Sequence, residues 1–135
     1  MGTKNLEKEK LVQEMAAMKK FEEEKRSQAI QEWKFRVDQV VWFIEECTWE
    51  TKNDIDDVQQ MSNTLESNLS QVCKACAELR GALGEDAKDF LDENEKVVAI
   101  ARDHIKLGAA RLQTIREEKL FAQKALEDKE AAEKF

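Results

Sequence analysis

The sequence contains no proline and only four glycines. A β-sandwich or an α/β fold needs more turn residues than this, so both classes are excluded. Charged residues make up 38% of the chain and hydrophobic residues 41%, a balance typical of long helices and coiled coils. The 135 residues are enough for one domain, so we expect a single helical domain over residues 1–135.

The chain also lacks a basic surface, a long apolar run and any catalytic motif. Its net charge of -7 argues against a surface that binds nucleic acid or anionic lipid. No apolar run approaches the roughly 20 residues needed to span a bilayer. Phosphate-binding glycine loops and the HExxH and GxSxG motifs are absent. We therefore expect a protein that is not an enzyme, needs no cofactor or metal, and binds neither nucleic acid nor membrane.

Cysteine is scarce, with three residues at Cys47, Cys73 and Cys76. An odd number of cysteines without a signal-peptide core favours a reducing, cytoplasmic location. Cys73 and Cys76 have the C-x-x-C spacing, but a zinc ribbon needs a second such pair. The lone His104 is expected about three turns away from Cys76. We interpret both cysteines of the pair as packing residues near the apolar seam of their helix.

Two breaks divide the chain, at residues 48–53 and 81–85. In the first, Thr51 and Asp54 have the spacing of a capping box. In the second, Gly84 is suited to a left-handed helix C-cap. The sequence therefore predicts three helices, at about residues 4–49, 53–82 and 86–133.

Apolar residues recur at steps of three and four within each predicted helix, which is the pattern of a coiled-coil seam. Short connections between such helices favour antiparallel neighbours. The first seam contains Ile30, Trp33, Val37, Val40, Ile44 and Cys47; the second contains Ile55, Val58, Met61, Leu65, Leu69, Val72, Cys76, Leu79 and Leu83; the third contains Leu91, Val98, Ala101, Ile105, Leu112 and Ile115.

Helix lengths add a further expectation. At about 1.5 Å per residue, the second helix spans roughly 45 Å and the other two roughly 70 Å each. The sequence thus predicts an all-α, antiparallel three-helix coiled-coil bundle whose long first and third helices overhang the shorter second helix. Residues 1–20 and 116–135 are left over at opposite ends. Leu11, Met15 and Met18 in the first overhang form a candidate protein interface.

A second candidate interface lies on the back of the first helix. The run from Val40 to Ile44 is apolar around the whole helix circumference. Phe35, Trp42 and Trp49 are spaced one heptad apart, opposite the seam, and Phe43 adjoins them. Aromatic anchors dominate interface energetics, so we expect these four residues to contact a partner.

The first two helices resemble a spectrin repeat. The similarity rests on Trp42 with Ile44-Glu45-Glu46, on Asp57-Val58-Gln59 and on Leu65-Glu66, within residues 26–115. The resemblance implies an antiparallel three-helix fold whose long helices continue into neighbouring repeats. Two departures are that the third helix has no tryptophan, and that the heptad register places Trp42 on the back face where the family buries its tryptophan.

These observations predict a non-catalytic scaffolding module of the cytoplasm that is either cytoskeletal or part of a larger coiled-coil protein. Homodimers, head-to-tail self-association and binding to other helical proteins all remain open as its mode of assembly. The alternative is a regulatory adaptor that binds an amphipathic helix on the aromatic stripe of the first helix. Whether the helices pack within one chain or are exchanged between two chains also remains open.

Overall fold

A computed structural model describes residues 2–134, with side chains from residue 4 onward. The elements are α1 (Gly2–Glu46), the 3-10 turn η1 (Trp49–Thr51), α2 (Ile55–Leu83), the 3-10 turn η2 (Gly84–Ala87) and α3 (Lys88–Glu133). The described residues contain no β-strand. The all-α class predicted from the sequence is therefore confirmed.

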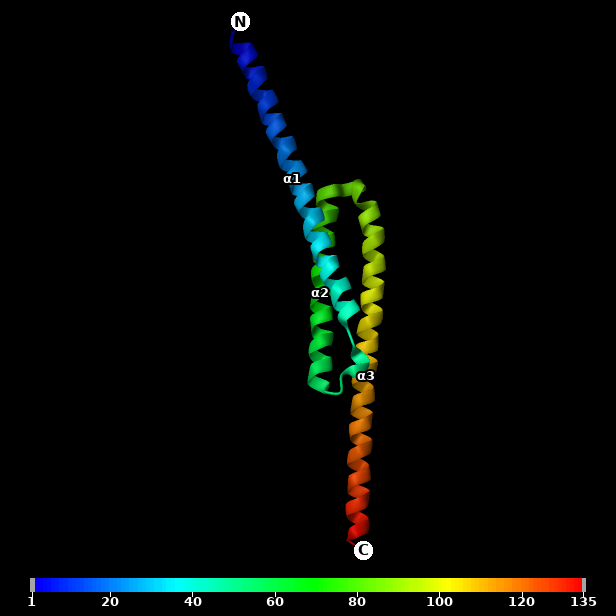
Figure 1. Cartoon of the computed structure of the whole chain (residues 1–135). Coiled ribbons are helices and arrows are strands. Elements are labelled where there is room, and N and C mark those ends of the chain that lie inside the picture. Colours follow the sequence, from blue (N-terminus) through cyan, green and yellow to red (C-terminus); the bar gives the residue numbers. More distant parts are fainter. Residues whose placement is uncertain (1, 135) are drawn as a thin grey trace.

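The three α-helices run side by side in the middle of an elongated molecule (Figure 1). The chain passes along α1, returns along α2 and passes again along α3, so that sequential helices are antiparallel. Most contacts between helices join α1 to α2 and α2 to α3, while α1 and α3 touch over a smaller area. The helix α2 is thus the element that holds the other two together.

The core follows the apolar seams of the three helices. Side chains at seam spacing are buried because a stripe along one side of each helix can leave water only by facing the other two helices. The buried apolar residues are Trp33, Val37, Val40, Trp49, Val58, Leu65, Val72, Ala75, Cys76, Leu79, Leu83, Ala87, Ala101, Leu112 and Ile115.

Trp33 is held in the core by both a hydrogen bond and an aromatic contact. Its indole Nε1 donates a hydrogen bond to Oδ1 of Asn94 on α3, at 2.9 Å. The edge of its ring meets Phe90, with ring centroids 5.5 Å apart and an interplanar angle of 81°. A buried tryptophan is stabilised by such a polar partner and by edge-to-face packing. Trp33 therefore links α1 directly to α3.

The end of α1 differs from the prediction. The helix ends at Glu46 rather than near residue 49, and the chain turns at Thr48 into η1. This turn brings Trp49 inward, where only 6% of its surface is exposed. If α1 continued to residue 49, the indole of Trp49 would lie on the exposed side with Trp42. The early end of the helix lets the chain turn the indole into the core.

The following loop also differs in detail from the expected capping box. The Thr51 hydroxyl donates to the carbonyl oxygen of Thr48, so Thr51 does not cap α2. Asp54 is the N-cap, and its carboxylate accepts a hydrogen bond from the backbone N–H of Asp56. On α3, Arg111 donates from Nε and Nη2 to the carbonyl oxygen of Lys52 at 3.0 and 2.8 Å. The loop is therefore fixed at both the helix start and α3.

The connection between α2 and α3 is made by η2. Gly84 has a φ of 58°, a conformation that side chains disfavour. Its backbone N–H donates to the carbonyl oxygen of Arg80 and closes the last turn of α2. Gly84 is thus the C-cap as expected, but its ψ of -123° lies outside the left-handed helical region that was predicted. The helix α3 begins at Lys88, two residues later than predicted.

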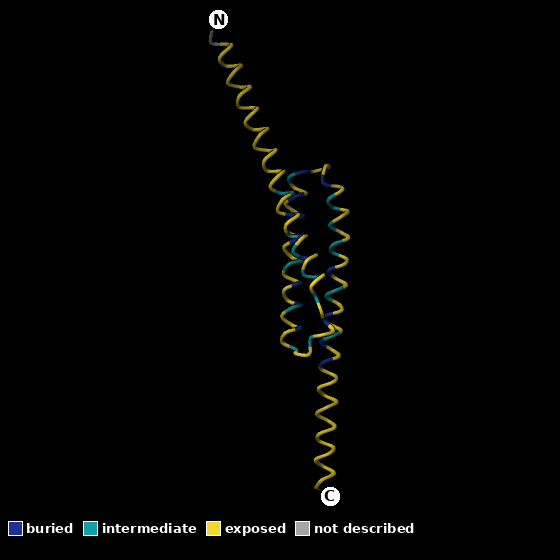
Figure 2. Tube along the Cα trace, viewed as in Figure 1, coloured by how far each residue is buried: buried dark blue, intermediate teal, exposed yellow. Residues whose placement is uncertain are grey.

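Two helix segments extend beyond the packed region, which we define as residues 29–115. All described side chains of residues 4–28 and of residues 116–134 are exposed (Figure 2). These overhangs lie at opposite ends of the molecule (Figure 1). Residues 22–28 are all polar and exposed, but they lie beside the end of α2, where Lys25 borders Gly81 and Ala82 and Arg26 forms an ion pair with Asp86 at 3.6 Å. The part of α1 that projects beyond α2 is therefore close to the expected 20 residues.

Candidate interaction surfaces

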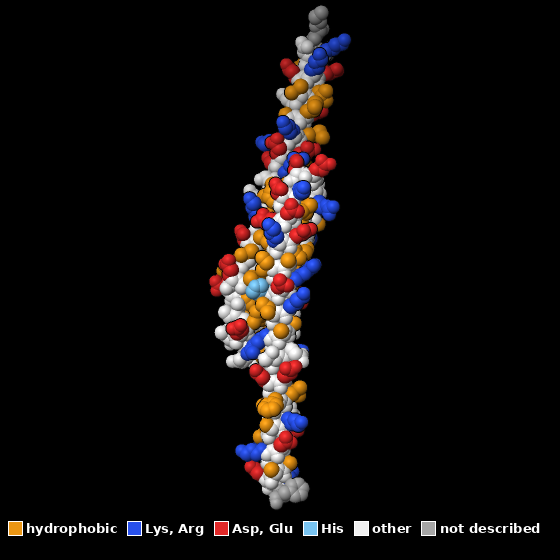
Figure 3. Space-filling view, turned by 90° about the vertical axis from the view of Figure 1, so that its right-hand side faces the viewer, with side chains coloured by type: hydrophobic (Ala, Val, Ile, Leu, Met, Phe, Trp, Pro, Cys, Tyr) orange, Lys and Arg blue, Asp and Glu red, His pale blue; other side chains and the backbone are white. Residues whose placement is uncertain are grey.

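The N-terminal overhang carries a regular apolar stripe. Leu11, Val12, Met15 and Met18, here called the overhang face, are all exposed. The steps of four and three from Leu11 through Met15 to Met18 place these three side chains on one side of α1. Hydrophobic side chains gather along this end of the molecule in Figure 3. The predicted interface residues of the overhang are therefore accessible to a partner.

The overhang face points in the same direction as the buried side of α1. Eighteen residues make about five full turns of an α-helix, so residues that far apart lie on the same side. Met15 therefore lies in line with the buried Trp33, and Leu11 with Ala29, which packs against the core. The stripe that packs inside the molecule continues beyond it, and there no segment of residues 2–134 covers it.

The aromatic stripe on the back of α1 is shorter than predicted. Phe35 and Trp42 are 52% and 63% exposed, and they form what we call the aromatic face. Trp49 is not part of it, because α1 ends before Trp49 and the indole turns into the core. Phe43 is half-buried and packs against the core. Trp49 is therefore not exposed as predicted, while Phe43 keeps part of its surface accessible. Contact of a partner with the predicted residues stays a prediction.

Trp49 occupies a notch in α3. A Cβ atom placed on Gly108 would lie 2.7 Å from Cη2 of the indole and 3.0 Å from two further ring carbons. Only a glycine leaves room for the ring at this point. The indole N–H of Trp49 has no hydrogen-bond partner among the described residues, so packing rather than a polar contact holds the ring in place.

The outer side of α3 has exposed apolar residues that the sequence reasoning missed. Ile100 and Leu107 are both exposed and lie one heptad apart. Figure 3 shows hydrophobic side chains around the histidine, which is His104. The heptad spacing of Ile100 and Leu107, away from the seam residues, was the signal that could have identified them.

The C-terminal overhang has a less regular surface. Leu120, Phe121 and Leu126 are exposed. The step of six positions from Leu120 to Leu126 corresponds to about 240° around the helix, so these two side chains do not share a face. This segment therefore lacks the continuous stripe of the N-terminal overhang.

The cysteines do not form a site. Cys73 is exposed, contrary to its predicted place near the seam, while Cys76 is buried and Cys47 is half-buried. Burial raises the pKa of the Cys76 thiol, and the neighbouring Cys73 adds to this effect. Burial also raises the pKa of the Cys47 thiol. A raised pKa disfavours the reactive thiolate, and no cluster of three potential metal ligands occurs within residues 2–134.

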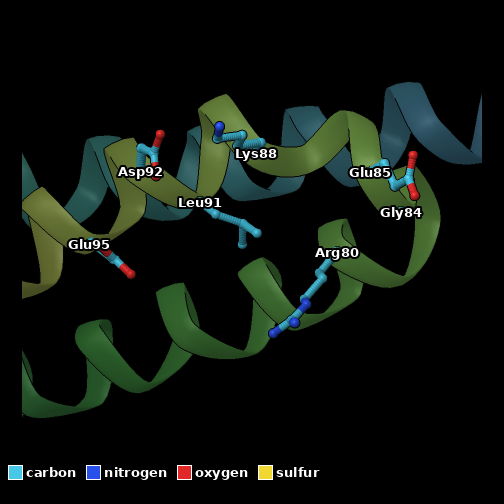
Figure 4. A pocket seen from close by; sticks show the side chains of 7 residues that line it. All are labelled: Arg80, Gly84, Glu85, Lys88, Leu91, Asp92 and Glu95. Atoms are coloured by element: carbon cyan, nitrogen blue, oxygen red, sulfur yellow. The ribbon is translucent and has the colours of Figure 1, made fainter.

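A shallow hollow lies beside the turn from α2 to α3 (Figure 4). Leu91 lies between the two helices there, and the surrounding charges are of both signs. The lining residues are Arg80, Gly84, Glu85, Lys88, Leu91, Asp92 and Glu95. The hollow contains no histidine, cysteine or hydroxyl side chain, so it does not hold a Ser–His or Cys–His pair of the kind used in acyl transfer.

Two further findings bear on function. None of the helices within the described residues has a stretch both long and apolar enough to cross a membrane. Comparisons of the chain with protein-family models, with curated proteins and with solved structures find no match.

Proposed function

We propose that the protein is a non-catalytic scaffolding module, an antiparallel three-helix coiled coil that self-associates through α1. The observation that carries this proposal is the N-terminal overhang, about 20 residues of helix beyond α2 with an exposed coiled-coil stripe. Isolated helices gain most of their stability in proteins from packing of an apolar face. An exposed stripe of large apolar residues is therefore the mark of a protein interface.

Self-association is tested by measuring the mass of the full chain in solution. Light scattering over a range of concentrations is expected to approach a mass near twice 15.6 kDa. The apparent mass should fall on dilution, because association follows mass action. A mass that stays near 15.6 kDa up to high concentration would contradict self-association.

A second candidate function rests on the aromatic face. Phe35 and Trp42 form an exposed pair on a helix whose other side is anchored in the core, which suits an adaptor that binds an amphipathic helix of another protein. Trp33 and Trp49 are already buried. Trp42 is thus the one tryptophan whose environment such a ligand would change.

The adaptor function predicts a fluorescence response. When a synthetic amphipathic helical peptide is titrated into the chain, tryptophan emission is expected to shift to shorter wavelength, because the ligand removes Trp42 from water. The variant Trp42→Phe should still bind but lose the shift. A binding curve whose shift persists in Trp42→Phe would place the ligand elsewhere.

The resemblance to spectrin repeats remains a proposal that concerns architecture. In that family the first-helix tryptophan is buried, whereas here Trp42 is exposed and Trp33 is buried. A relationship would therefore require Trp33 to take the place of the family's tryptophan. Attachment to the cytoskeleton and a place within a longer coiled-coil protein are proposals that follow from this relationship alone.

A further inference from the structure

Resting on the proposed self-association, we propose that the overhang face binds the same face of a second copy of this chain in the antiparallel direction. The two packed regions then lie at opposite ends of the dimer. The two N-terminal overhangs form a short two-stranded coiled coil between them. This arrangement specifies the residues of the interface and the direction of the partner.

No segment of residues 2–134 of the same chain can fill this position. The helix α2 ends at Leu83, and its last turn lies beside Ala29, where Gly81 and Ala82 line a hollow together with Lys25 and Gln28. The C-terminal overhang of α3 points away from the other end of the molecule (Figure 1). The overhang face is therefore not covered by any part of residues 2–134 of the same chain.

The charge of the overhang favours a second copy. Residues 4–28 contain seven Lys or Arg and six Glu residues, whereas the whole chain has a net charge of -7. Two overhangs can therefore approach without the repulsion that two acidic surfaces would produce. Balanced charges beside an apolar stripe are typical of coiled-coil partners.

Steric constraints select the antiparallel direction. The overhang face and the buried face of α1 lie on the same side of the helix, and from Ala29 onward that side is covered by α2 and α3. A parallel partner helix would continue into the end of α2. An antiparallel partner brings only its N-terminus there. The segment that pairs in both copies without reaching α2 is residues 12–21, about 15 Å of helix.

Electrostatics select the same direction. Glu22, Glu23 and Glu24 are consecutive acidic residues. A parallel pair would hold the two acidic runs at the same level, and like charges in contact positions are destabilising. In the antiparallel pair the acidic run of one copy lies level with the segment around Lys8 and Lys10 of the second copy.

The register follows from the spacing of the stripe. In an antiparallel coiled coil, each layer pairs the two alternating seam positions of the facing helices. Met15 of one copy therefore lies against Met18 of the second copy. Val12 of one copy then lies near Phe21 of the second copy. All four side chains are exposed in the single chain. Burial of these four side chains in both copies removes apolar surface from water and so favours association.

The interface is tested by the double variant Met15→Glu with Met18→Glu in the full chain. Four carboxylates would then face one another across the seam, and a buried charge without a partner is costly. The dissociation constant is expected to rise by about a hundredfold or more. The packed region should be unchanged, because neither methionine contacts the core.

The matched control is Trp42→Ala, which removes a large exposed residue from the same helix but from a different face. It is expected to leave the dimer intact. If the dimer instead survives the double methionine variant and is lost in Trp42→Ala, self-association stands and the overhang interface is overturned. A wild-type chain that stays monomeric overturns both self-association and the overhang dimer.

Direction is tested by disulfide trapping in a Cys73→Ser background, since Cys73 is the exposed native thiol. In the antiparallel register, Met15→Cys and Met18→Cys should each fail to cross-link alone but form a disulfide dimer when mixed. Leu11→Cys should not cross-link to itself, because the two positions are about 16 Å apart along the axis. Efficient self-cross-linking of Leu11→Cys would overturn the antiparallel direction.

Discussion

Replacing Gly108 with leucine is expected to lower the free energy of unfolding by about 3 kcal/mol, because the new side chain expels Trp49 from the core. A Cβ atom alone would lie 2.7 Å from the indole, closer than any van der Waals contact. The loop that carries Trp49 is tied to α3 by the hydrogen bonds of Arg111. The ring therefore cannot retreat without loss of those bonds.

Urea unfolding, monitored by circular dichroism, measures this change. Tryptophan fluorescence of the folded variant should in addition shift to longer wavelength, because the indole of Trp49 becomes exposed. Gly108→Ala is expected to have a smaller effect. The gain in helix propensity of roughly 1 kcal/mol opposes the clash.

The matched control is Gly81→Leu. Gly81 lies within α2 and is exposed, and a Cβ atom added there meets nothing within 4 Å. This variant is expected to gain up to about 1 kcal/mol, since leucine favours the helix more than glycine does. If Gly108→Leu were as stable as Gly81→Leu, the notch that holds Trp49 would not exist as described.

The spacing of apolar residues predicted most of the core. Trp33, Val37 and Val40 lie at steps of three and four, and all three are buried. The same spacing identified Leu65 and Leu79 on α2. Such predictions succeed because a helix has one geometry, so residues at these steps share a side whatever the rest of the chain does.

The position of Trp49 could not be predicted in this way. Trp49 follows Trp42 by one heptad, so it would share the face of Trp42 if α1 continued. The helix ends at Glu46 instead, and the pocket for the indole is formed by Gly108, which is far away in the sequence. Gly108 lies within the third seam, but nothing in the neighbouring sequence indicates that an aromatic ring packs against it. A contact between distant segments of this kind is set by tertiary packing.

The candidate surfaces were predicted only in part, because helix length can be read from the sequence but tertiary packing cannot. Leu11, Met15 and Met18 are exposed because α2 is too short to reach them, a conclusion that needs only helix lengths. For Phe43 the sequence was ambiguous, because the run from Val40 to Ile44 is apolar on every side. Which of those sides is covered depends on where α2 and α3 lie.

Replacing Trp33 with alanine is expected to lower the free energy of unfolding by about 4 kcal/mol, whereas Trp42→Ala should change it by no more than about 0.5 kcal/mol. Trp33 is 2% exposed, and its loss leaves a cavity beside Phe90 and removes the hydrogen bond to Asn94. Trp42 has no comparable contacts in the core. Thermal or urea unfolding at equal protein concentration measures both changes.

Trp33→Phe separates packing from hydrogen bonding in this comparison. Phenylalanine keeps an aromatic ring near Phe90 but leaves the Asn94 amide oxygen unpaired, so we expect a loss of about 1–3 kcal/mol, smaller than that of Trp33→Ala. The nine residues from Trp33 to Trp42 turn the helix by about 180°. The two side chains therefore lie on opposite sides of α1. Similar losses for Trp33→Ala and Trp42→Ala would mean that both sides of α1 are covered, and the aromatic face would then be part of the core rather than a surface for a partner.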